Sequence, residues 1–465
     1  MPPSSAWRCS QLKTGKRFNF FMVQRTIGAY GLLLTRVRRW PDNQIRDAQM
    51  LYTGYDIQRS MLAGAGWIAQ KQADWLNSFT NGPFNYGGLA PVAASALDVF
   101  AHSVLPRGKP TFGLDFVDID GKHLPVTEIN EARKPFGQLK HFTYEGSTDK
   151  PKLLICAPMS GHFATLLRGT VERMLPTHDV YITDWKDARD VPLTGGGFDL
   201  ESYIDYLIEW LEFIGPDAGG PDNSGRGAHM LAVCQPSVPA YAAAAIMSAN
   251  EHPLRPRTLT MMGGPIDTRE APTAVNNHAT RRPHDWFVQN VIATVPPYYK
   301  GSGRRVYPGF LQLSGFMSMN LGNHMISHWS MFSDLVEGDG EGADRHKEFY
   351  DEYRAVCDMT AEFYLQTVDT VFQRHLLPKG EFNYRGKLVD PGAIKDIAIL
   401  AIEGERDDIS GLGQTKAALK VATGLPDKMK KYHMAPEVGH YGIFNGSKWR
   451  DKIAPVVENW IASHN

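Results

Sequence analysis

The sequence is poor in cysteine. Its 465 residues contain four cysteines that lie far apart and form no C-x-x-C pair: Cys9, Cys156, Cys234 and Cys357. This spacing argues against a disulfide framework and against a zinc site, and it is typical of a protein from a reducing cytosol. We therefore expect no bound metal and no cofactor, and any cysteine chemistry should depend on a single thiol.

The chain also lacks long apolar runs and lacks an excess of charge. No stretch of about 18 apolar residues occurs, so the sequence predicts no transmembrane helix. A net charge of −1 argues against a protein that binds nucleic acid or membrane surfaces through charge. With 43% hydrophobic and 21% charged residues, the composition is that of a globular protein. Its length allows one large domain with insertions, or two to three domains.

Acidic residues are scarce at the start of the chain. Residues 1–49 contain Asp42 and Asp47 against nine basic residues: Arg8, Lys13, Lys16, Arg17, Arg25, Arg36, Arg38, Arg39 and Arg46. A targeting peptide is one interpretation, although Arg25 and Arg36 interrupt the apolar stretch that a signal peptide needs. We favour the other interpretation, a basic, disordered extension ahead of Met50.

Beyond residue 50 the pattern changes from helical to alternating. Residues 50–130 predict a helix to Phe79 and then a loop-rich region with one short helix at 91–102. Short apolar runs then alternate with amphipathic helices, one of which begins after Asp199 as its cap. This alternation predicts a mostly parallel sheet flanked by helices. The predicted strands are 139–144, 153–156, 180–184, 230–233, 258–262, 397–402 and 431–434.

The alternation stops between residues 266 and 390. This stretch is rich in aromatic residues and methionine, from Trp286 to Phe332, and it predicts a helical insertion before the last strands. A cap over an active site is one interpretation, and a helical subdomain with an ordinary core is the other. The sheet-forming core should therefore comprise residues 131–265 and 391–465.

One stretch combines a strand, a tight turn and a helix with a reactive side chain at the turn. The apolar run ending at Val233 is followed by Cys234, Gln235 and an alanine-rich helix. This is the arrangement of the nucleophile elbow of α/β hydrolases, with cysteine in place of serine. Ala232 and Pro236 occupy the two positions that usually hold glycine. A buried, inert cysteine on a core strand is the alternative interpretation.

An acid and a histidine follow later in the chain, as the α/β-hydrolase order requires. The apolar run at 397–402 leads into a turn rich in carboxylates, where Asp407 is the candidate acid and Asp408 the alternative. A solvated acidic loop would explain the same residues. His440 ends a loop after the predicted strand 431–434 and precedes a closing helix. Because each candidate follows a strand, we predict a triad of Cys234, Asp407 and His440.

The chemistry that such a triad performs is acyl transfer. A helix N-terminus and an imidazole would favour the thiolate of Cys234. His440 would carry the proton, and Asp407 would orient the ring. Backbone N–H groups of Gln235 and of Met159 or Ser160 are the expected donors to an oxyanion.

Other signals favour structural roles. His324 and His328 have the spacing of metal ligands, but no glutamate motif or third ligand accompanies them. Cys156 lies within a predicted strand, which favours a buried and inert thiol.

Several motifs together resemble one family, the intracellular polyhydroxyalkanoate (polyhydroxybutyrate) depolymerases. The resemblance covers about residue 50 to the C-terminus and is carried by these segments: Met50-Leu-Tyr, Ile155-Cys-Ala-Pro-Met-Ser-Gly-His162, Tyr181-Ile-Thr-Asp-Trp185, Val233-Cys-Gln-Pro236, Tyr307-Pro-Gly-Phe-Leu-Gln-Leu313, Gly315-Phe-Met-Ser-Met-Asn320, Gly404-Glu-Arg-Asp-Asp-Ile-Ser410 and Val438-Gly-His-Tyr-Gly442. Cys234, Asp407 and His440 fall on the positions of that family's cysteine, aspartate and histidine.

The resemblance implies an α/β-hydrolase fold and a cytoplasmic enzyme at the surface of storage granules. It further implies that the enzyme cleaves amorphous polyester, chiefly poly(3-hydroxybutyrate), into hydroxyacid monomers and oligomers. Water or coenzyme A could accept the acyl group. A polymer synthase with the same nucleophile and a non-enzymatic granule protein are the alternatives, and the oligomeric state stays open.

Overall fold

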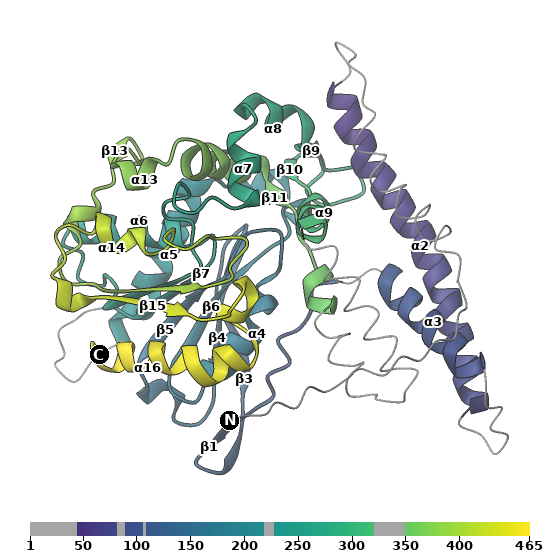
Figure 1. The fold of residues 1–465 in the computed structure, drawn as a ribbon, viewed down its shortest axis with the longest axis horizontal. Coiled ribbons are helices and arrows are strands. Elements are labelled where there is room, and N and C mark those ends of the chain that lie inside the picture. Colours follow the sequence, from purple (N-terminus) through teal and green to yellow (C-terminus); the bar gives the residue numbers. More distant parts are fainter. Residues whose placement is uncertain (1–43, 81–88, 106–107, 218–226, 320–346, 348–349) are drawn as a thin grey trace, which may run out of the picture. The chain divides into compact units, whose positions relative to one another are not determined.

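The fold is organised around one eight-stranded sheet. The computed structural model describes residues 44–80, 89–105, 108–217, 227–319, 347 and 350–465. The strand order is β15-β14-β8-β7-β5-β6-β4-β3 (Figure 1). The strands are β3 (Thr127–Arg133), β4 (Gly137–Thr143), β5 (Lys152–Cys156), β6 (Asp179–Trp185), β7 (His229–Val233), β8 (Thr258–Met262), β14 (Ala398–Gly404) and β15 (Lys430–Ala435).

Six of these strands run parallel, from β6 through β5, β7, β8 and β14 to β15. The strands β4 and β3 add an antiparallel edge beside β6. Every residue of β5, β7, β8 and β14 is buried. Strands covered on both faces need apolar side chains on both faces, which explains their continuous apolar runs. The predicted mostly parallel sheet is therefore confirmed.

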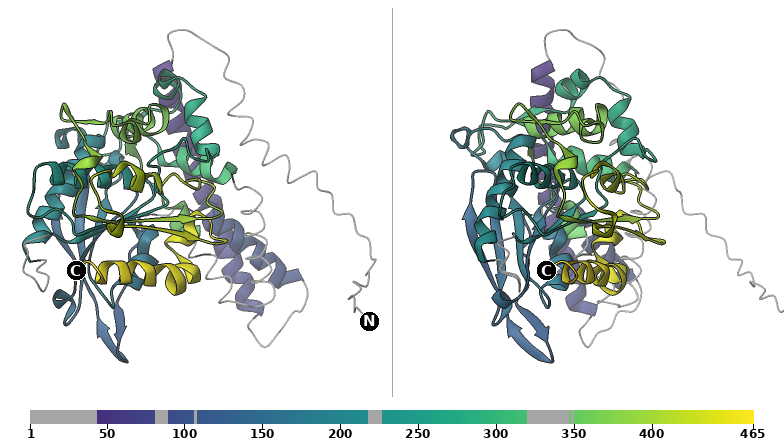
Figure 2. Two further views of the ribbon diagram at one scale, coloured as in Figure 1. Left: turned by 60° about the vertical axis from the view of Figure 1, so that its left-hand side comes forward. Right: turned by 90° about the vertical axis from the view of Figure 1, so that its left-hand side faces the viewer.

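Helices cover both faces of the sheet (Figures 1 and 2). On one face, α4 (Arg168–Met174) lies beside α16 (Ala454–Ala462), where Arg173 Nη1 is 2.6 Å from Glu458 Oε1. On the other face lie α5 (Leu200–Ile214), α6 (Ser237–Ala249) and α14 (Ala417–Val421). The predicted cap of α5 is present, because Asp199 Oδ1 accepts a hydrogen bond from Ser202 N at 2.7 Å.

The alanine-rich helix α6 is buried almost along its whole length. Its small side chains allow a close approach to the neighbouring helix α5 and to the sheet. The helix also contacts α14, where Tyr241 donates a hydrogen bond to the carbonyl oxygen of Ala418 at 3.2 Å. Because α6 begins directly after the Cys234 turn, this packing holds the turn in place.

The insertion between β8 and β14 contains helices and small sheets. Its described helices are α7 (Ala274–Thr280), α8 (His284–Asn290), α9 (Gly309–Met319), α12 (Ala361–Thr367) and α13 (Leu376–Lys379). The sequence predicted a helical insertion, but three short strands pair as β11-β10-β9, and a hairpin joins β12 to β13. Their bounds are β9 (Ala293–Thr294), β10 (Arg305–Tyr307), β11 (Met359–Thr360), β12 (Asn383–Tyr384) and β13 (Lys387–Leu388). Strands of two or three residues are too short to produce a period in the sequence.

The N-terminal region differs from its prediction in two respects. The helix α2 (Gln44–Thr80) begins before Met50, whereas residues 1–43 of the predicted extension lie outside the described residues. Strands β1 (Phe116–Ile119), β2 (Lys122–Pro125) and β3 occupy part of the region predicted as helices and loops. The strand β3 carries almost only exposed residues, so it has no apolar alternation to reveal it. The remaining helix, α3 (Leu89–Val104), contains the short helix predicted there. Within the described part of the chain, no helix is long and apolar enough to cross a membrane.

A buried carboxylate fastens the loop after β14. Glu403 is 1% exposed, and its Oε1 accepts hydrogen bonds from the backbone N–H groups of Thr415 and Lys416 at 2.7 and 2.8 Å. Its Oε2 accepts hydrogen bonds from Gly413 N and Tyr432 Oη at 2.9 and 2.8 Å. One side chain therefore fixes the segment 413–416 and the neighbouring strand β15.

Replacing Glu403 should destabilise the protein strongly. The substitution Glu403→Ala leaves buried N–H groups without an acceptor, and we expect a loss of about 3 kcal/mol or more in the free energy of unfolding. The matched control is Glu405→Ala, because Glu405 is exposed and accepts one hydrogen bond, from Glu437 N. Urea denaturation should show a loss below about 1 kcal/mol for that variant. Equal losses for both variants would contradict the role of Glu403.

Candidate active site

Cys234 lies in a sharp turn between β7 and α6. Its φ angle is +66°, in the left-handed region of backbone conformation. Residues other than glycine adopt this conformation at a cost of about 1–2 kcal/mol. Two hydrogen bonds hold the turn: Cys234 N donates to Met262 O at 2.7 Å, and Ser237 N donates to Cys234 O at 3.1 Å. The residue is partly exposed, whereas Cys156 and Cys357 are buried. The predicted burial of Cys156 in a strand is confirmed.

Two glycines make room for this turn. Gly263, at φ +61°, follows β8, and a Cβ built there would lie 3.2 Å from both Asp407 Oδ2 and His440 Cε1. A Cβ on Gly264 would lie 2.0 Å from Ser237 Oγ and 3.2 Å from the carbonyl oxygen of Cys234. The end of β8 therefore packs directly against the start of α6 and against the Asp407–His440 pair.

Asp407 and His440 form a buried pair. The Oδ2 atom of Asp407 is 2.7 Å from His440 Nδ1, and its Oδ1 accepts hydrogen bonds from Ile409 N and Ser410 N at 2.9 and 2.8 Å. His440 is 5% exposed and also makes a side-chain hydrogen bond to Cys234. The three residues that the sequence singled out are thus in contact, with the imidazole between the carboxylate and the thiol.

The charge of the site favours a protonated imidazole. Burial opposes the charging of His440, but the nearby Asp407 carboxylate and the Cys234 sulfur outweigh it, and the pKa of His440 lies well above its usual 6.5. This arrangement can move a proton from the thiol to the ring and hold the resulting imidazolium.

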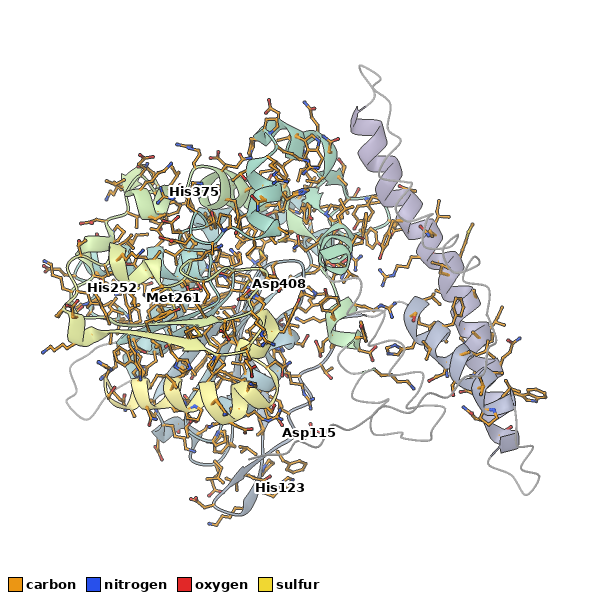
Figure 3. All side chains as sticks on the ribbon, viewed as in Figure 1. Asp115, His123, His252, Met261, His375 and Asp408 are labelled. Carbon is orange, nitrogen blue, oxygen red and sulfur yellow. The ribbon has the colours of Figure 1, made fainter. Side chains whose placement is uncertain are left out.

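The charge of Asp408, the alternative acid, acts on a pair of tyrosines near the site. The Tyr353 and Tyr441 rings meet edge to face at 5.8 Å, and their hydroxyls share a hydrogen bond. Burial raises the pKa of Tyr441 well above its usual value, and the charges of Tyr353, Cys234 and Asp408 raise it further. In Figure 3, Asp408 and His252 are labelled at opposite ends of the sheet, with Met261 between them. Asp408 therefore lies at the end of the sheet where the parallel strands finish.

The two residues predicted to supply the oxyanion donors contact each other through one backbone N–H group and one side chain. Met159 N donates a hydrogen bond to the side-chain Oε1 of Gln235 at 3.3 Å. The loop after β5 that carries Met159 is fastened at Ala157, whose N–H donates to Thr183 Oγ1 at 2.9 Å. The carbonyl oxygen of Ala157 accepts hydrogen bonds from Trp185 Nε1 and Tyr203 Oη at 2.8 and 3.0 Å. The carboxamide oxygen of Gln235 thus occupies the N–H group of Met159, the residue predicted to supply the second oxyanion donor.

Sequence reasoning missed the supporting residues of the site. The Gly263–Gly264 pair directly after a predicted strand was a usable signal, since glycine often marks a close approach of backbone. No sequence pattern marked the Gln235 side chain or the Tyr353–Tyr441 pair, because their contacts join segments far apart in the chain. The pair His324 and His328 lies outside the described residues.

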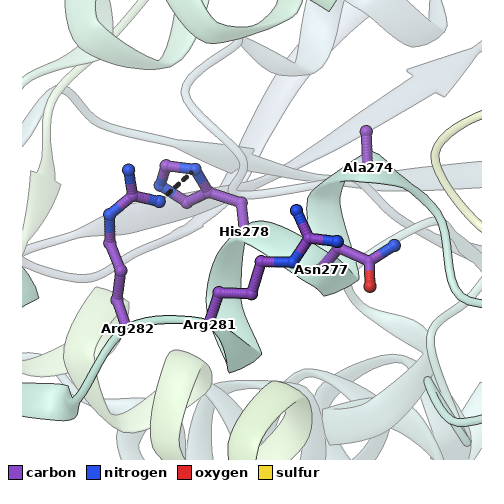
Figure 4. Close-up of a pocket in the computed structure, with 5 residues that line it drawn as sticks. All are labelled: Ala274, Asn277, His278, Arg281 and Arg282. Carbon is purple, nitrogen blue, oxygen red and sulfur yellow. Dashed lines mark hydrogen bonds between the residues drawn. The ribbon is translucent and has the colours of Figure 1, made fainter.

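A separate hollow lies on α7. It has a volume of about 500 Å³ and is lined by Ala274, Asn277, His278, Arg281 and Arg282 (Figure 4). His278 Nδ1 and Arg282 Nη1 lie 2.9 Å apart, and the pKa of His278 is lowered by burial and by the arginine. None of the residues that the sequence singled out lines this hollow, so its chemistry is separate from that of Cys234.

Comparison with known families identifies the C-terminal part of the chain. Residues 263–465 match the family model described as PHB de-polymerase C-terminus. This part of the chain is therefore similar to the C-terminal part of that family. The matched stretch begins directly after β8 and includes Asp407 and His440, whereas Cys234 precedes it. No curated protein matches the sequence.

Solved structures of hydrolases are also similar to this chain. A putative lipase from Acinetobacter baumannii is 11% identical, with a TM-score of 0.39, over 73% of this chain and 93% of that one. The 2-hydroxy-6-oxo-6-phenylhexa-2,4-dienoate hydrolase from Rhodococcus sp. is 9% identical, with a TM-score of 0.38, over 72% and 99%. A thermophilic esterase from Thermogutta terrifontis is 14% identical, with a TM-score of 0.37, over 73% and 99%. The strand order of the eight-stranded sheet is that of an α/β-hydrolase fold.

The first prediction from this geometry concerns Gly264. We expect Gly264→Ala to lower both thermal stability and activity, because the new Cβ would overlap Ser237 Oγ and push α6 away from β8. The expected loss is about 2 kcal/mol or more in the free energy of unfolding. The control is Gly54→Ala in α2, where a Cβ meets nothing within 4 Å and helix propensity favours alanine. A melting temperature for Gly264→Ala equal to that of the wild type would disprove the close packing.

The second prediction concerns pH. The folded pKa of His440 lies above its unfolded value, so the stability that charging of the ring contributes is complete below about pH 6.5 and is lost as pH rises through the folded pKa. Asp407→Asn removes the Asp407 charge but keeps an oxygen for the Ile409 and Ser410 amides. Its stability penalty should therefore be larger at pH 6 than at pH 9, by on the order of 1 kcal/mol.

Chemical denaturation at the two pH values measures this difference. Glu437→Gln is the control, because Glu437 forms an exposed ion pair with Arg406. We expect its small effect on stability to be the same at both pH values. A penalty for Asp407→Asn that does not change between pH 6 and pH 9 would show that Asp407 does not set the charge of His440.

Proposed function

We propose that this chain is an intracellular polyhydroxyalkanoate depolymerase that cleaves poly(3-hydroxybutyrate) through an acyl-cysteine intermediate on Cys234. The observation that carries the proposal is the contact series Cys234–His440–Asp407 at the carboxyl ends of the parallel strands. The match of residues 263–465 to the PHB de-polymerase C-terminus model supports a polyester as substrate. We further propose that the enzyme acts in the cytoplasm, at the surface of polymer granules.

In the first half of the reaction, the thiol proton moves to His440 and the sulfur attacks the carbonyl carbon of an ester. The negative charge that develops on the carbonyl oxygen is stabilised by the N–H groups of Gln235 and Met159. The ester C–O bond then breaks, and the imidazolium donates its proton to the departing oxygen. A polymer chain with a free hydroxyl leaves, and a thioester remains on Cys234.

In the second half, an acceptor removes the acyl group. Water, deprotonated by His440, attacks the thioester, and the products are the free thiol and a hydroxyacid or a carboxyl-terminated oligomer. Coenzyme A thiol in place of water would give a hydroxyacyl-CoA. Asp407 stabilises the imidazolium in both halves and holds Nε2 toward the sulfur, because Nδ1 is engaged with the carboxylate.

The Gln235 side chain has a defined part in this scheme. Its carboxamide oxygen accepts from Met159 N at 3.3 Å, a long hydrogen bond that a charged oxyanion would replace with a shorter one. The side chain thus stands in for the substrate oxygen in the free enzyme. It must turn aside when an ester binds.

The test is release of 3-hydroxybutyrate from amorphous granules by the purified full-length protein. Cys234→Ala should lower the rate by a factor on the order of 10³ or more, because no nucleophile remains. The matched control is Cys156→Ala, which removes a buried thiol on the neighbouring strand β5. We expect that variant to keep most of its activity.

Three outcomes would contradict the proposal. Unchanged release by Cys234→Ala would remove the thiol from the mechanism. Growth of polymer from 3-hydroxybutyryl-CoA would indicate a synthase-like acyltransferase that uses the same residues. Granule binding by the wild type without any release, in the presence or absence of coenzyme A, would indicate a non-enzymatic granule protein.

A further inference from the structure

An apolar stripe runs along the exposed side of α2. Ile57, Met61, Ile68 and Trp75 are 53%, 71%, 54% and 60% exposed. Their spacings of four and seven residues place them on one face of the helix, over a length of about 27 Å. Trp67 lies beside the stripe and is also 60% exposed. Contiguous exposed apolar patches on soluble proteins mark sites of interaction.

The opposite side of α2 is fixed to the rest of the protein. Tyr52, 1% exposed, donates a hydrogen bond to the buried carboxylate of Asp358. The ring of Tyr55 stacks on Phe310 of α9 at 3.9 Å. Further along, Gly66 packs so closely that a Cβ there would lie 2.6 Å from Val104 of α3. The stripe is therefore the outward face of a helix that is already anchored.

The contact between Tyr52 of α2 and Asp358 is connected to the loop 157–162, which carries the predicted oxyanion donor Met159. Asp358 follows Cys357, whose N–H donates to Gly161 O at 2.8 Å. One residue earlier, Val356 forms a bridge with His162. The loop 157–162 that carries Met159 is thus joined through residues 356–358 to Tyr52. A surface on α2 is therefore connected through these contacts to the loop beside Cys234.

A groove adjoins the N-terminal end of the stripe. It has a volume of about 640 Å³ and is lined by α2 residues from Thr53 to Ala63, among them Ile57 and Met61, and by Tyr298 and Tyr299. The hydroxyls of both tyrosines donate to Asp56 Oδ2, at 2.6 and 3.3 Å, so the carboxylate that lines the groove is paired. The groove also contains the polar side chains of Thr53, Arg59 and Ser60, and it shares Ile57 and Met61 with the stripe.

The charges of α2 favour an uncharged partner. Residues 60–70 contain no charged side chain, and between residues 50 and 80 Arg59 and Lys71 are balanced by Asp56 and Asp74. A helix that binds anionic lipid carries an excess of lysine and arginine on its polar face. The absence of this excess argues against a lipid headgroup surface and fits an uncharged, apolar one.

The pattern also argues against pairing with a second copy of the helix. A coiled-coil seam through Ile57, Met61, Ile68 and Trp75 would need apolar side chains at the intervening seam positions. Those positions hold Gly64 and Lys71, so the seam lacks two of its knobs. A flat, deformable surface needs no such interdigitation.

We propose that this outward face of α2 binds the surface of the aliphatic polyester, so that the enzyme sits on solid polymer while Cys234 cleaves it. The inference rests on the proposed function for the identity of the polymer. An amorphous polyester is uncharged and apolar, as the stripe is, and it offers a surface wide enough for a straight stripe of that length. Burial of exposed apolar side chains supplies the free energy of adsorption.

Two charge-introducing variants of the full-length protein test the proposal. Met61→Glu/Ile68→Glu places two carboxylates in the stripe. The control Gln58→Glu/Ser78→Glu adds the same two charges at exposed positions of α2 outside the stripe. Binding is measured by sedimentation with particles of amorphous poly(3-hydroxybutyrate), in a Cys234→Ala background that leaves the particles intact.

The dissociation constant for the particles should rise by about tenfold or more with Met61→Glu/Ile68→Glu and by less than about twofold with the control. With Cys234 intact, the ratio of the rate on particles to the rate on a soluble short ester should fall in the same proportion. Circular dichroism and the melting temperature check folding. Should the double glutamate variant unfold, Ile68→Ser/Trp75→Ser removes the same face without adding charge.

Several outcomes would overturn the inference. One is an unchanged dissociation constant for both stripe variants. Another is a wild-type dimer in sedimentation velocity that becomes monomeric in Met61→Glu/Ile68→Glu while particle binding is unchanged, which would assign the stripe to a second copy. Tighter binding to phosphatidylcholine vesicles than to polyester would assign it to lipid. Because binding is measured without Cys234 and release with it, loss of the proposed catalysis would not be mistaken for loss of the surface.

Discussion

The left-handed turn at Cys234 is the constraint on which the rest of the site depends. A non-glycine residue at φ +66° persists only where its surroundings hold it. Here the end of β8 supplies that support, since Met262 O accepts from Cys234 N and Gly264 packs against Ser237 at the start of α6. Any side chain larger than hydrogen at Gly264 would separate the two elements. The strained turn in return lifts the thiol out of the buried core.

The parallel arrangement of the sheet brings the other groups to the same place. The segments after β5, β7, β8, β14 and β15 supply Met159, Cys234, Gly263, Asp407 and His440 respectively. In a parallel sheet these segments all leave the same edge, so groups separated by up to 281 positions (440 − 159) become neighbours. Glu403 fixes the loop at 413–416, and Thr415 Oγ1 accepts from Gly264 N at 2.8 Å. Thr415 therefore connects Glu403, at the end of β14 before Asp407, with Gly264, which packs against the Cys234 turn.

The insertion is joined to the sheet by a buried pair of carboxyl groups. Asp187, which follows β6, accepts a hydrogen bond from Asp358 N at 3.1 Å and pairs with Arg189 at 2.9 Å. Burial and the neighbouring Asp358 carboxylate raise the pKa of Asp187 to about 8, although Arg189 opposes the shift. Tyr52 of α2 hydrogen-bonds to the same Asp358. One carboxylate pair thus connects the sheet, the insertion and the N-terminal helix.

The sequence by itself determined the parallel core and the three chemical groups. Buried strands need continuous apolar runs, and the order cysteine, acid, histidine follows from where each segment leaves the sheet. Only the tertiary structure decided what depends on contacts between distant segments: that Asp407 rather than Asp408 meets the imidazole, and that Gln235 faces Met159. The edge strand β3 and the exposed stripe of α2 also needed coordinates. Whether a side chain is exposed depends on how the whole chain packs. The local sequence of a charged edge strand such as β3, or of a helix such as α2, does not reveal which of its faces is exposed to water.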